Sequence, residues 1–347
     1  MTKRALGLTL GLTVGTTLLG SAVLAQRPGA GLSRECRREV VKLCGLSGGR
    51  AGIRACLAQR YVSLSEGCRS VIVSVAAQRA ADQGKLPDGA QTVTYGSNPL
   101  QVLDFWPSVK GGKAPLIVFV HGGGWKRGSK DNATGKFKPE HYPAEGYAFA
   151  SINYRLVPAA TVEQQAADVA SAVKALLARA DTLGIDQRRV VLTGHSAGAH
   201  LVALVGTDES YLKGAGLSFA NISGIIPIDG AAYDVPAQMA DGPQIMQGTY
   251  SQAFGTDPAR QKSLSPTFQT GAPNAPEFLL LYVQRPDGVR QANALGAALK
   301  AGGTRVEIGS FPGEGLKGHA EINRRLGDPT YPATATVDAW LKRVFAR

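Results

Sequence analysis

A glycine-flanked serine between two strongly patterned segments is the feature that most constrains how this chain can fold. Residues 189–193 (RVVLT) form a short apolar run typical of a buried strand, and a helical pattern begins at Ala197. Gly194 and Gly198 stand two residues before and two residues after Ser196. A strand that turns directly into a helix tolerates only small residues at these places, and it exposes the serine hydroxyl. The segment therefore predicts a nucleophile elbow, with Ser196 as the attacking group.

Strand-like and helix-like segments alternate from about residue 92 onward. The predicted strands lie at 92–95, 101–105, 116–120, 147–153, 189–193, 224–228, 278–283 and 305–311. The predicted helices lie at 162–183, 289–301 and 333–345, with one more from Ala197. This alternation predicts an α/β fold, with a mainly parallel central sheet flanked by helices. Residues 230–275 lack a clear period and are expected to form loops and short helices over the carboxyl edge of the sheet, where ligands bind in such folds.

A second glycine-rich motif, HGGGW at residues 121–125, directly follows a predicted apolar strand. Acyl transfer needs N–H donors aimed at the oxyanion that forms on the attacked carbonyl. Glycines let the backbone approach that oxygen, and this motif supplies such donors in lipases and esterases. We assign the oxyanion hole to the N–H groups of Gly123, Gly124 and Ala197, and we expect Trp125 to line the substrate pocket.

The general base follows from the order of the remaining histidines. In folds with this elbow, the acid and then the histidine come after the serine. Only His200 and His319 satisfy that order. His200 lies one helical turn beyond Ser196 and is expected to be a packed structural residue, while His121 is expected to brace its own loop. We therefore predict that His319, in a glycine-rich loop after the last strand, is the base.

Two aspartates compete for the role of the acid that orients the histidine. Asp287 follows the predicted strand 278–283, and Asp229 ends the predicted strand 224–228. Asp287 occupies the place where the fold usually carries its acid. We predict Asp287 and keep Asp229 as the alternative.

The first 25 residues resemble a targeting segment. Lys3 and Arg4 precede a long apolar run, and small residues stand at Val23 and Ala25. This pattern predicts a signal peptide cleaved after Ala25, and hence a periplasmic or secreted protein. A retained N-terminal membrane anchor is the alternative.

All four cysteines of the chain lie within 33 residues, at Cys36, Cys44, Cys56 and Cys68. An even, clustered count in an exported chain predicts two disulfides. The gaps of seven, eleven and eleven residues do not resemble the tight pairs of a zinc site. An antiparallel helical hairpin favours the nested pairing, Cys44 with Cys56 and Cys36 with Cys68, among the three that are possible. The segment resembles the eukaryotic-type cysteine-rich repeat of Golgi glycoproteins and some bacterial exported proteins.

The sequence therefore divides into three parts. We expect the signal peptide at 1–25, a disulfide-stapled α-hairpin at 26–85 and a larger domain at 92–347, with a linker rich in Gly and Pro at 83–90. The net charge is +12, and residues 26–90 contain eleven Lys and Arg against five Asp and Glu. This basic segment lacks a pattern of interleaved aromatic residues, since Tyr61 is its one aromatic, and it lies on an exported part, so nucleic acid is not an expected partner. Contact with an anionic envelope surface is compatible with its charge.

The larger domain resembles a known family in several motifs. HGGGW, SINYRL (151–156), GHSAGAHL (194–201) and the spacing of Asp287 and His319 are similar to the bacterial esterase/lipase branch related to hormone-sensitive lipase. Its kynurenine-formamidase-like and feruloyl-esterase-like members are the nearer resemblance. The resemblance implies an α/β-hydrolase fold, a Ser–Asp–His triad and an oxyanion hole made by the HGGG glycines.

Two departures from the family pattern bear on the site. The His-Gly-x-x-Asp that usually carries the acid is YVQRPD at 282–287 here, which leaves the acid assignment weaker. The helical cap of larger lipases is not evident, so a small and fairly open acyl pocket is expected.

These observations predict an exported serine carboxylic-ester hydrolase that acts on a small-molecule or polymer-linked ester. The alternatives within the enzymes are an arylformamidase and a feruloyl or acetyl esterase. A catalytically inactive, hydrolase-like binding module is the alternative of another class. The sequence contains no metal-ligand cluster or phosphate loop, so no metal or cofactor is expected.

Overall fold

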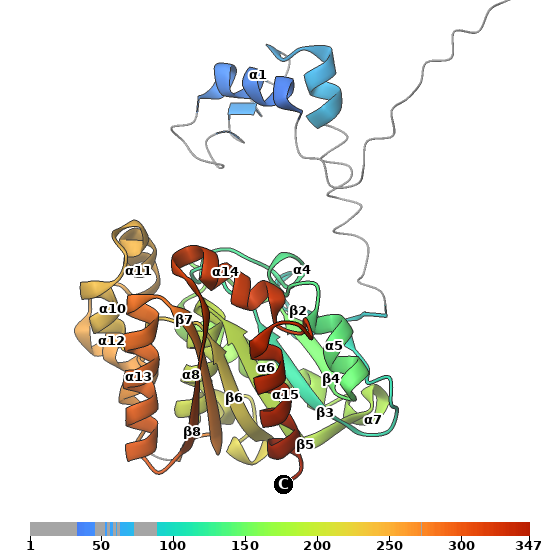
Figure 1. Cartoon of the computed structure of the whole chain (residues 1–347), viewed down its shortest axis with the longest axis vertical. Coiled ribbons are helices and arrows are strands. Elements are labelled where there is room, and N and C mark those ends of the chain that lie inside the picture. Colours follow the sequence, from blue (N-terminus) through green and yellow to red (C-terminus); the bar gives the residue numbers. More distant parts are fainter. Residues whose placement is uncertain are drawn as a thin grey trace, which may run out of the picture. The chain divides into compact units, whose positions relative to one another are not determined.

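The computed structural model describes residues 33–45, 53, 56, 57, 60, 63–72 and 89–347 except 272. The chain divides into two compact units, residues 1–85 and 86–347 (Figure 1). The predicted signal peptide and most of the predicted linker lie outside the described residues. No helix in the described ranges combines the length and the apolar character needed to cross a membrane.

The described part of the first unit is helical and is held by two disulfides. Helix α1 spans Arg34–Cys44, residues 66–72 are also helical, and the bonds join Cys36 to Cys68 and Cys44 to Cys56. This is the nested pairing that the spacing favours. Among the described residues of this unit, the buried apolar cluster is small and consists of Cys36, Val40, Leu64 and Cys68. A core of this size buries too little surface to hold a fold alone, so covalent bonds contribute much of the stability.

The second unit is built on an eight-stranded sheet in the order β1-β2-β4-β3-β5-β6-β7-β8. The strands are β1 Gln91–Thr94, β2 Val102–Trp106, β3 Ala114–Val120, β4 Ala148–Ile152, β5 Ile185–His195, β6 Ile222–Ile228, β7 Glu277–Gln284 and β8 Arg305–Glu314. β2 pairs antiparallel with β1 and β4, and all other neighbours are parallel. The predicted α/β-hydrolase fold, with a mainly parallel sheet, is thus confirmed.

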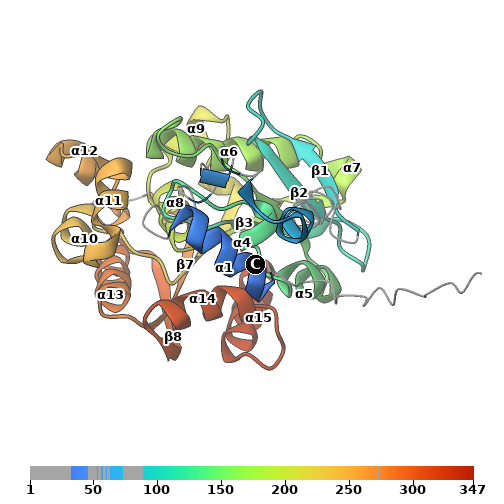
Figure 2. The same ribbon diagram turned by 90° about the horizontal axis from the view of Figure 1, so that it is seen from above.

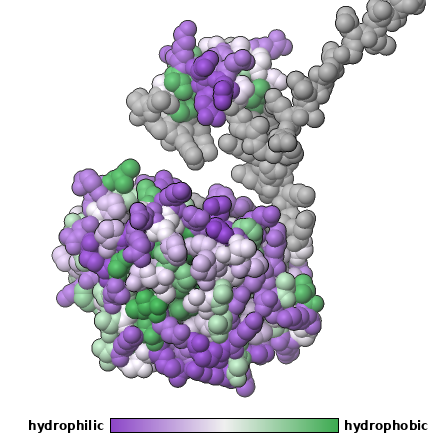
Figure 3. Space-filling model, in the orientation of Figure 1, coloured by the Kyte–Doolittle hydropathy of each residue, from purple (hydrophilic) through white to green (hydrophobic). Residues whose placement is uncertain are grey.

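Helices cover both faces of this sheet (Figure 2). One face packs against α6 Val162–Leu177, α8 Ala197–Thr207 and α13 Pro286–Ala301. The other face packs against α5 Lys138–Glu145, α14 Gly315–Arg325 and α15 Pro332–Phe345. The central strands are buried on both sides, which explains their continuous apolar runs. Hydrophilic residues cover most of the face of this unit shown in Figure 3.

The remaining helices are short. α4 Lys130–Ala133, α7 Ala180–Leu183 and α9 Ser210–Gly214 connect the main elements, so the helix expected over 162–183 is in fact α6 followed by α7. Residues 230–275 form α10 Val235–Asp241, α11 Gln247–Phe254 and α12 Pro258–Ser263, with short 3₁₀ turns between them.

Two element boundaries differ from the sequence-based expectation in ways that matter for the site. α13 begins at Pro286, directly after β7, so Asp287 lies in the first turn of a helix. His319 lies within α14 and not in a flexible loop.

Candidate active site

Ser196 lies at a sharp turn between β5 and α8. Its backbone has φ 57° and ψ −117°, a positive φ that a non-glycine residue adopts only under constraint. Its N–H donates to the carbonyl of Ile228, and its own carbonyl accepts from the N–H of His200. These bonds tie the strained turn to β6 and to the first turn of α8.

The two glycines of the elbow are required by direct contact. A Cβ on Gly194 would lie 2.4 Å from the carbonyl oxygen of Gly198. A Cβ on Gly198 would lie 2.1 Å from the carbonyl oxygen of Val120, at the end of β3. Both distances are far inside van der Waals contact, so no larger residue fits without moving the backbone. The structure thus contains the tight turn that the motif predicts.

The HGGGW loop passes directly beside this turn. A Cβ on Gly122 would lie 3.0 Å from the Cβ of Ser196. Gly123 and Gly124 have φ 133° and φ 61°, conformations that favour glycine. Gly123, Gly124 and Ala197 line the same pocket as Ser196. Ala197 is the first residue of α8, so its N–H has no partner within the helix and is free to bind an anion.

Side chains behind the loop hold it in place. The ring of His121 is buried and stacks on Tyr154, with ring centroids 4.3 Å apart. The Tyr154 hydroxyl donates to the carbonyl of His121. Arg155, next in the SINYRL segment, binds the carboxylate of Asp168 on α6. His121 therefore lies where a loop-bracing residue is expected, and SINYRL supplies its support.

Trp125 lines the pocket and is buried. Its indole Nε1 donates to Nδ1 of His200, 3.2 Å away, and its ring packs edge-on against Phe254. Because Nδ1 of His200 accepts this bond, Nε2 carries the proton and donates to the carbonyl of Leu264. Burial lowers the pKa of His200 to about 4. His200 is therefore a neutral, fully bonded imidazole behind the pocket wall.

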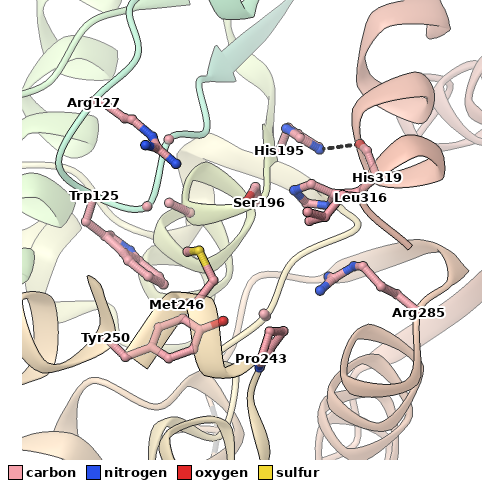
Figure 4. Close-up of a pocket in the computed structure, with 14 residues that line it drawn as sticks. Trp125, Arg127, His195, Ser196, Pro243, Met246, Tyr250, Arg285, Leu316 and His319 are labelled. Atoms are coloured by element: carbon pink, nitrogen blue, oxygen red, sulfur yellow. Dashed lines mark hydrogen bonds between the residues drawn. The ribbon is translucent and has the colours of Figure 1, made fainter. Parts of the chain in front are cut away.

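His319 is held by Asp229. Nδ1 of His319 lies 2.5 Å from Oδ2 of Asp229, and because a carboxylate only accepts, Nδ1 carries the proton. Nε2 is then free to take a proton from a hydroxyl. His319 and Ser196 line the same pocket, and Figure 4 shows the imidazole directed toward the serine.

The predicted contact between Asp287 and His319 is wrong. The Asp287 carboxylate instead accepts from Nη1 of Arg285 at 2.8 Å and from the Gln238 amide at 3.1 Å. The physical reason is the early start of α13, which places Asp287 in its first turn. Asp229, kept as the alternative, is the carboxylate that His319 contacts.

Asp229 is buried at the end of β6 with φ 42°. Burial by itself raises the pKa of Asp229, but the hydrogen bond from His319 and the charge of Arg285 outweigh it, so the pKa lies below its usual value. Nε of Arg285 lies 3.1 Å from Oδ2 of Asp229, and Oδ1 accepts from the N–H of Val283. The carboxylate is therefore ionised and fixed in direction.

His195, the residue before the serine, also contacts His319. Its Nε2 donates to the backbone carbonyl of His319 at 2.8 Å, and the two rings lie 4.4 Å apart (Figure 4). Burial and the neighbouring His319 hold the pKa of His195 well below its usual value, so its ring is neutral. The turn at Ser196 is thus bonded directly to α14, the helix that carries His319.

Helix α14 is also anchored at its far end. The buried ammonium of Lys138 on α5 donates to the Asn323 amide oxygen at 3.0 Å and to the Thr134 carbonyl at 2.8 Å. The sequence gives no signal for the roles of Lys138, Arg285 and His195. Their partners in these roles are Asn323, Asp229 and His319 in turn, and each partner is remote in sequence. Asp229 has a signal, its position after an apolar strand, and Asp287 shares it.

The pocket has a volume of about 200 Å³ and fourteen lining residues (Figure 4). The HGGGW loop, the elbow and α14 form one part of its wall. Pro243, Met246 and Tyr250, from the segment of short helices at 230–275, form another part. That segment therefore contributes to the site, although its sequence shows no lipase-type cap.

Comparison with known proteins agrees with this geometry. The BD-FAE family profile matches residues 103–226. Esterase LipC of Mycobacterium tuberculosis is 29% identical over 237 residues, which are 64% of this chain and 58% of LipC. Isoprenylcysteine alpha-carbonyl methylesterase ICME of Arabidopsis thaliana is 30% identical over 132 residues, 37% of this chain and 30% of that protein. The matches thus span less than two thirds of these relatives.

Solved structures share the fold. The crystal structure of esterase B from Lactobacillus rhamnosis superposes with a TM-score of 0.61 at 22% identity, covering 80% of this chain and 93% of that one. Four observations agree with a relationship to the α/β-hydrolase esterases: the strand order, the turn at Ser196, the family profile and the esterase relatives. The chain thus has the α/β-hydrolase fold, and part of its sequence is similar to proteins named as esterases.

Proposed function

We propose that this chain hydrolyses carboxylic esters through an acyl-enzyme on Ser196, with His319 as base and Asp229 as the acid that orients it. The observation that carries the proposal is the hydrogen bond from Nδ1 of His319 to Asp229, within a pocket that Ser196 also lines. The similarity to proteins named as esterases supports the reaction class.

The chemistry follows from the positions of the protons. Nε2 of His319 takes the proton of the Ser196 hydroxyl as the oxygen attacks the ester carbonyl. His319 then returns this proton to the departing alcohol, and the acyl group remains on Ser196. Water, deprotonated by the same nitrogen, attacks the acyl-enzyme and releases the acid. Asp229 stabilises the imidazolium in both steps.

The oxyanion that develops on the attacked carbonyl needs N–H donors. We propose the N–H groups of Gly123, Gly124 and Ala197 for this role. The amino end of α8 adds a partial positive charge beneath them. One such donor typically contributes about 10²–10³-fold to turnover.

A fluorophosphonate probe tests the nucleophile directly. The wild-type chain is expected to be labelled at Ser196, and Ser196→Ala is expected to lose labelling and about 10⁴-fold or more of its esterase activity. Ser223→Ala is the matched control, because this hydroxyl donates to the Arg188 carbonyl and does not line the pocket. An unlabelled wild-type chain without activity would favour the inactive binding module.

A panel of p-nitrophenyl esters, formylkynurenine and feruloyl sugars would separate esterase, arylformamidase and feruloyl esterase activity.

We further propose that the protein is exported and cleaved after Ala25. The two disulfides support this, since such bonds persist in oxidising compartments. N-terminal sequencing of the mature protein tests it, with Gln26 as the expected first residue.

The basic first unit would then contact an anionic envelope surface, and binding to anionic vesicles that weakens with salt would support that contact.

A further inference from the structure

The pocket around Ser196 has an unusual balance of charge. Two arginines, Arg127 and Arg285, line it, whereas none of its lining residues in the described part of the chain is Asp or Glu. In a partly enclosed site, charges interact more strongly than in water. Whether each guanidinium already has a partner therefore decides which ligands the pocket favours.

The charge of Arg285 is already balanced. Its guanidinium is buried and lies against the carboxylates of Asp229 and Asp287, at 3.1 and 2.8 Å. Its Nη2 donates to the carbonyls of Asp229 and Gly230. Arg285 therefore supports the acid and has little capacity left to bind a substrate.

Arg127 is different. It lies between β3 and α4, two residues beyond Trp125, and its side chain is exposed. Among the described residues its guanidinium has no ion pair and no hydrogen bond to another side chain or carbonyl. Figure 4 shows the guanidinium at the mouth of the pocket, on the side of the HGGGW loop. This is an unpaired, five-donor cation beside the nucleophile.

The backbone of Arg127 is nevertheless fixed. A Cβ on Gly123 would lie 2.0 Å from the carbonyl oxygen of Arg127, so the loop folds tightly back on the proposed oxyanion donors. Gly128 follows it with φ 97°, and a Cβ on Gly128 would lie 2.3 Å from the carbonyl oxygen of Gly122. The loop thus holds the base of the side chain while its charged end stays free.

We propose that Arg127 binds a carboxylate on the substrate, so that the preferred substrates are esters with a carboxylate on the acyl or the alcohol part. A guanidinium and a carboxylate form two parallel charge-assisted hydrogen bonds, which gives direction as well as affinity. This inference rests on the proposed esterase function.

Two matched substrate pairs test it and identify the part that carries the charge. p-Nitrophenyl hydrogen glutarate against p-nitrophenyl pentanoate varies the acyl part, and 4-acetoxybenzoate against 4-acetoxybenzamide varies the alcohol part. The measured quantity is kcat/KM for the anionic member divided by kcat/KM for the neutral one. Arg127→Gln is expected to lower this ratio about 10-fold or more in at least one pair, mainly through KM.

Lys126→Gln is the matched control, because it removes the same charge from the neighbouring exposed residue, which does not line the pocket. It is expected to leave both ratios within about twofold of wild type, since a charge outside the pocket lining acts on the substrate only through salt-screened solvent. Ratios that change less than twofold in Arg127→Gln, or that change equally in Lys126→Gln, would overturn the assignment while leaving the esterase intact. A wild-type chain that cleaves no ester of either pair would instead overturn the esterase proposal, and this inference with it.

Discussion

The guanidinium of Arg285 lies between two carboxylates, with its Nε 3.1 Å from Oδ2 of Asp229 and its Nη1 2.8 Å from Oδ2 of Asp287. Only Asp229 also contacts His319. The two aspartates therefore share a counter-charge but have different neighbours, which makes their roles separable by experiment.

Asp229→Asn is expected to lower kcat on p-nitrophenyl butyrate by about 10⁴-fold, because an amide no longer fixes the proton on Nδ1 of His319. Asp287→Asn is expected to have a much milder effect, since it weakens only the contacts to Arg285 and Gln238. Steady-state kinetics of both variants, with circular dichroism to verify folding, checks the ranking. The reverse ranking would return the acid to Asp287.

Gly198→Ala is expected to destabilise the second unit by roughly 1–3 kcal/mol or more, because its Cβ would overlap the carbonyl of Val120. Gly214→Ala is the matched control. A Cβ there meets nothing within 4 Å, and alanine favours the helix by up to about 1 kcal/mol. Urea unfolding of both variants measures the difference, and equal midpoints would show that the elbow relaxes around the added methyl.

His200 makes stability depend on pH. Its pKa is lowered to about 4 by burial, whereas an unfolded histidine titrates near about 6.5. Between these values the unfolded chain binds a proton that the folded chain does not. This contribution to the free energy of unfolding is complete above about pH 6.5 and is lost as the pH falls toward 4, at up to about 1.4 kcal/mol per pH unit.

His200→Gln should therefore show a shallower fall in unfolding free energy between pH 7 and pH 5 than the wild type. Denaturant titrations at pH 8, 7, 6 and 5 measure both slopes. At pH 8 the two proteins differ only by the pH-independent cost of losing the bonds to Trp125 and Leu264. Parallel curves over the whole range would contradict the burial of a neutral His200.

The disulfides should stabilise the first unit and leave hydrolysis unchanged. Replacing Cys36 and Cys68 with serine is expected to cost roughly 2–5 kcal/mol there, and about 1 kcal/mol more than replacing Cys44 and Cys56, because the closed loop is longer. Peptide mapping without reduction should recover both bonds, and limited proteolysis should report the stability. The lining residues that the structure describes all lie in the second unit. A parallel loss of esterase activity would therefore show that the first unit takes part in the reaction.

The sequence alone was sufficient for the features that depend on neighbouring residues. The turn at Ser196 needs small residues at fixed offsets in the chain, so Gly194 and Gly198 identify it without any tertiary information. The same holds for the HGGG loop after β3 and for the cysteine pairing, because a hairpin of about 33 residues favours one nested arrangement. The alternation of strands and helices likewise indicated the α/β class.

Only the tertiary structure shows that Asp229, and not Asp287, contacts His319. β6 and β7 are neighbours in the sheet, so both aspartates follow strands that end at the same edge. The choice depends on where α13 begins, on the guanidinium of Arg285, and on the helix that presents His319, none of which follows from local spacing. The same holds for Arg127, whose guanidinium has no ion-pair partner among the described residues, because the fold determines which groups come close to a side chain.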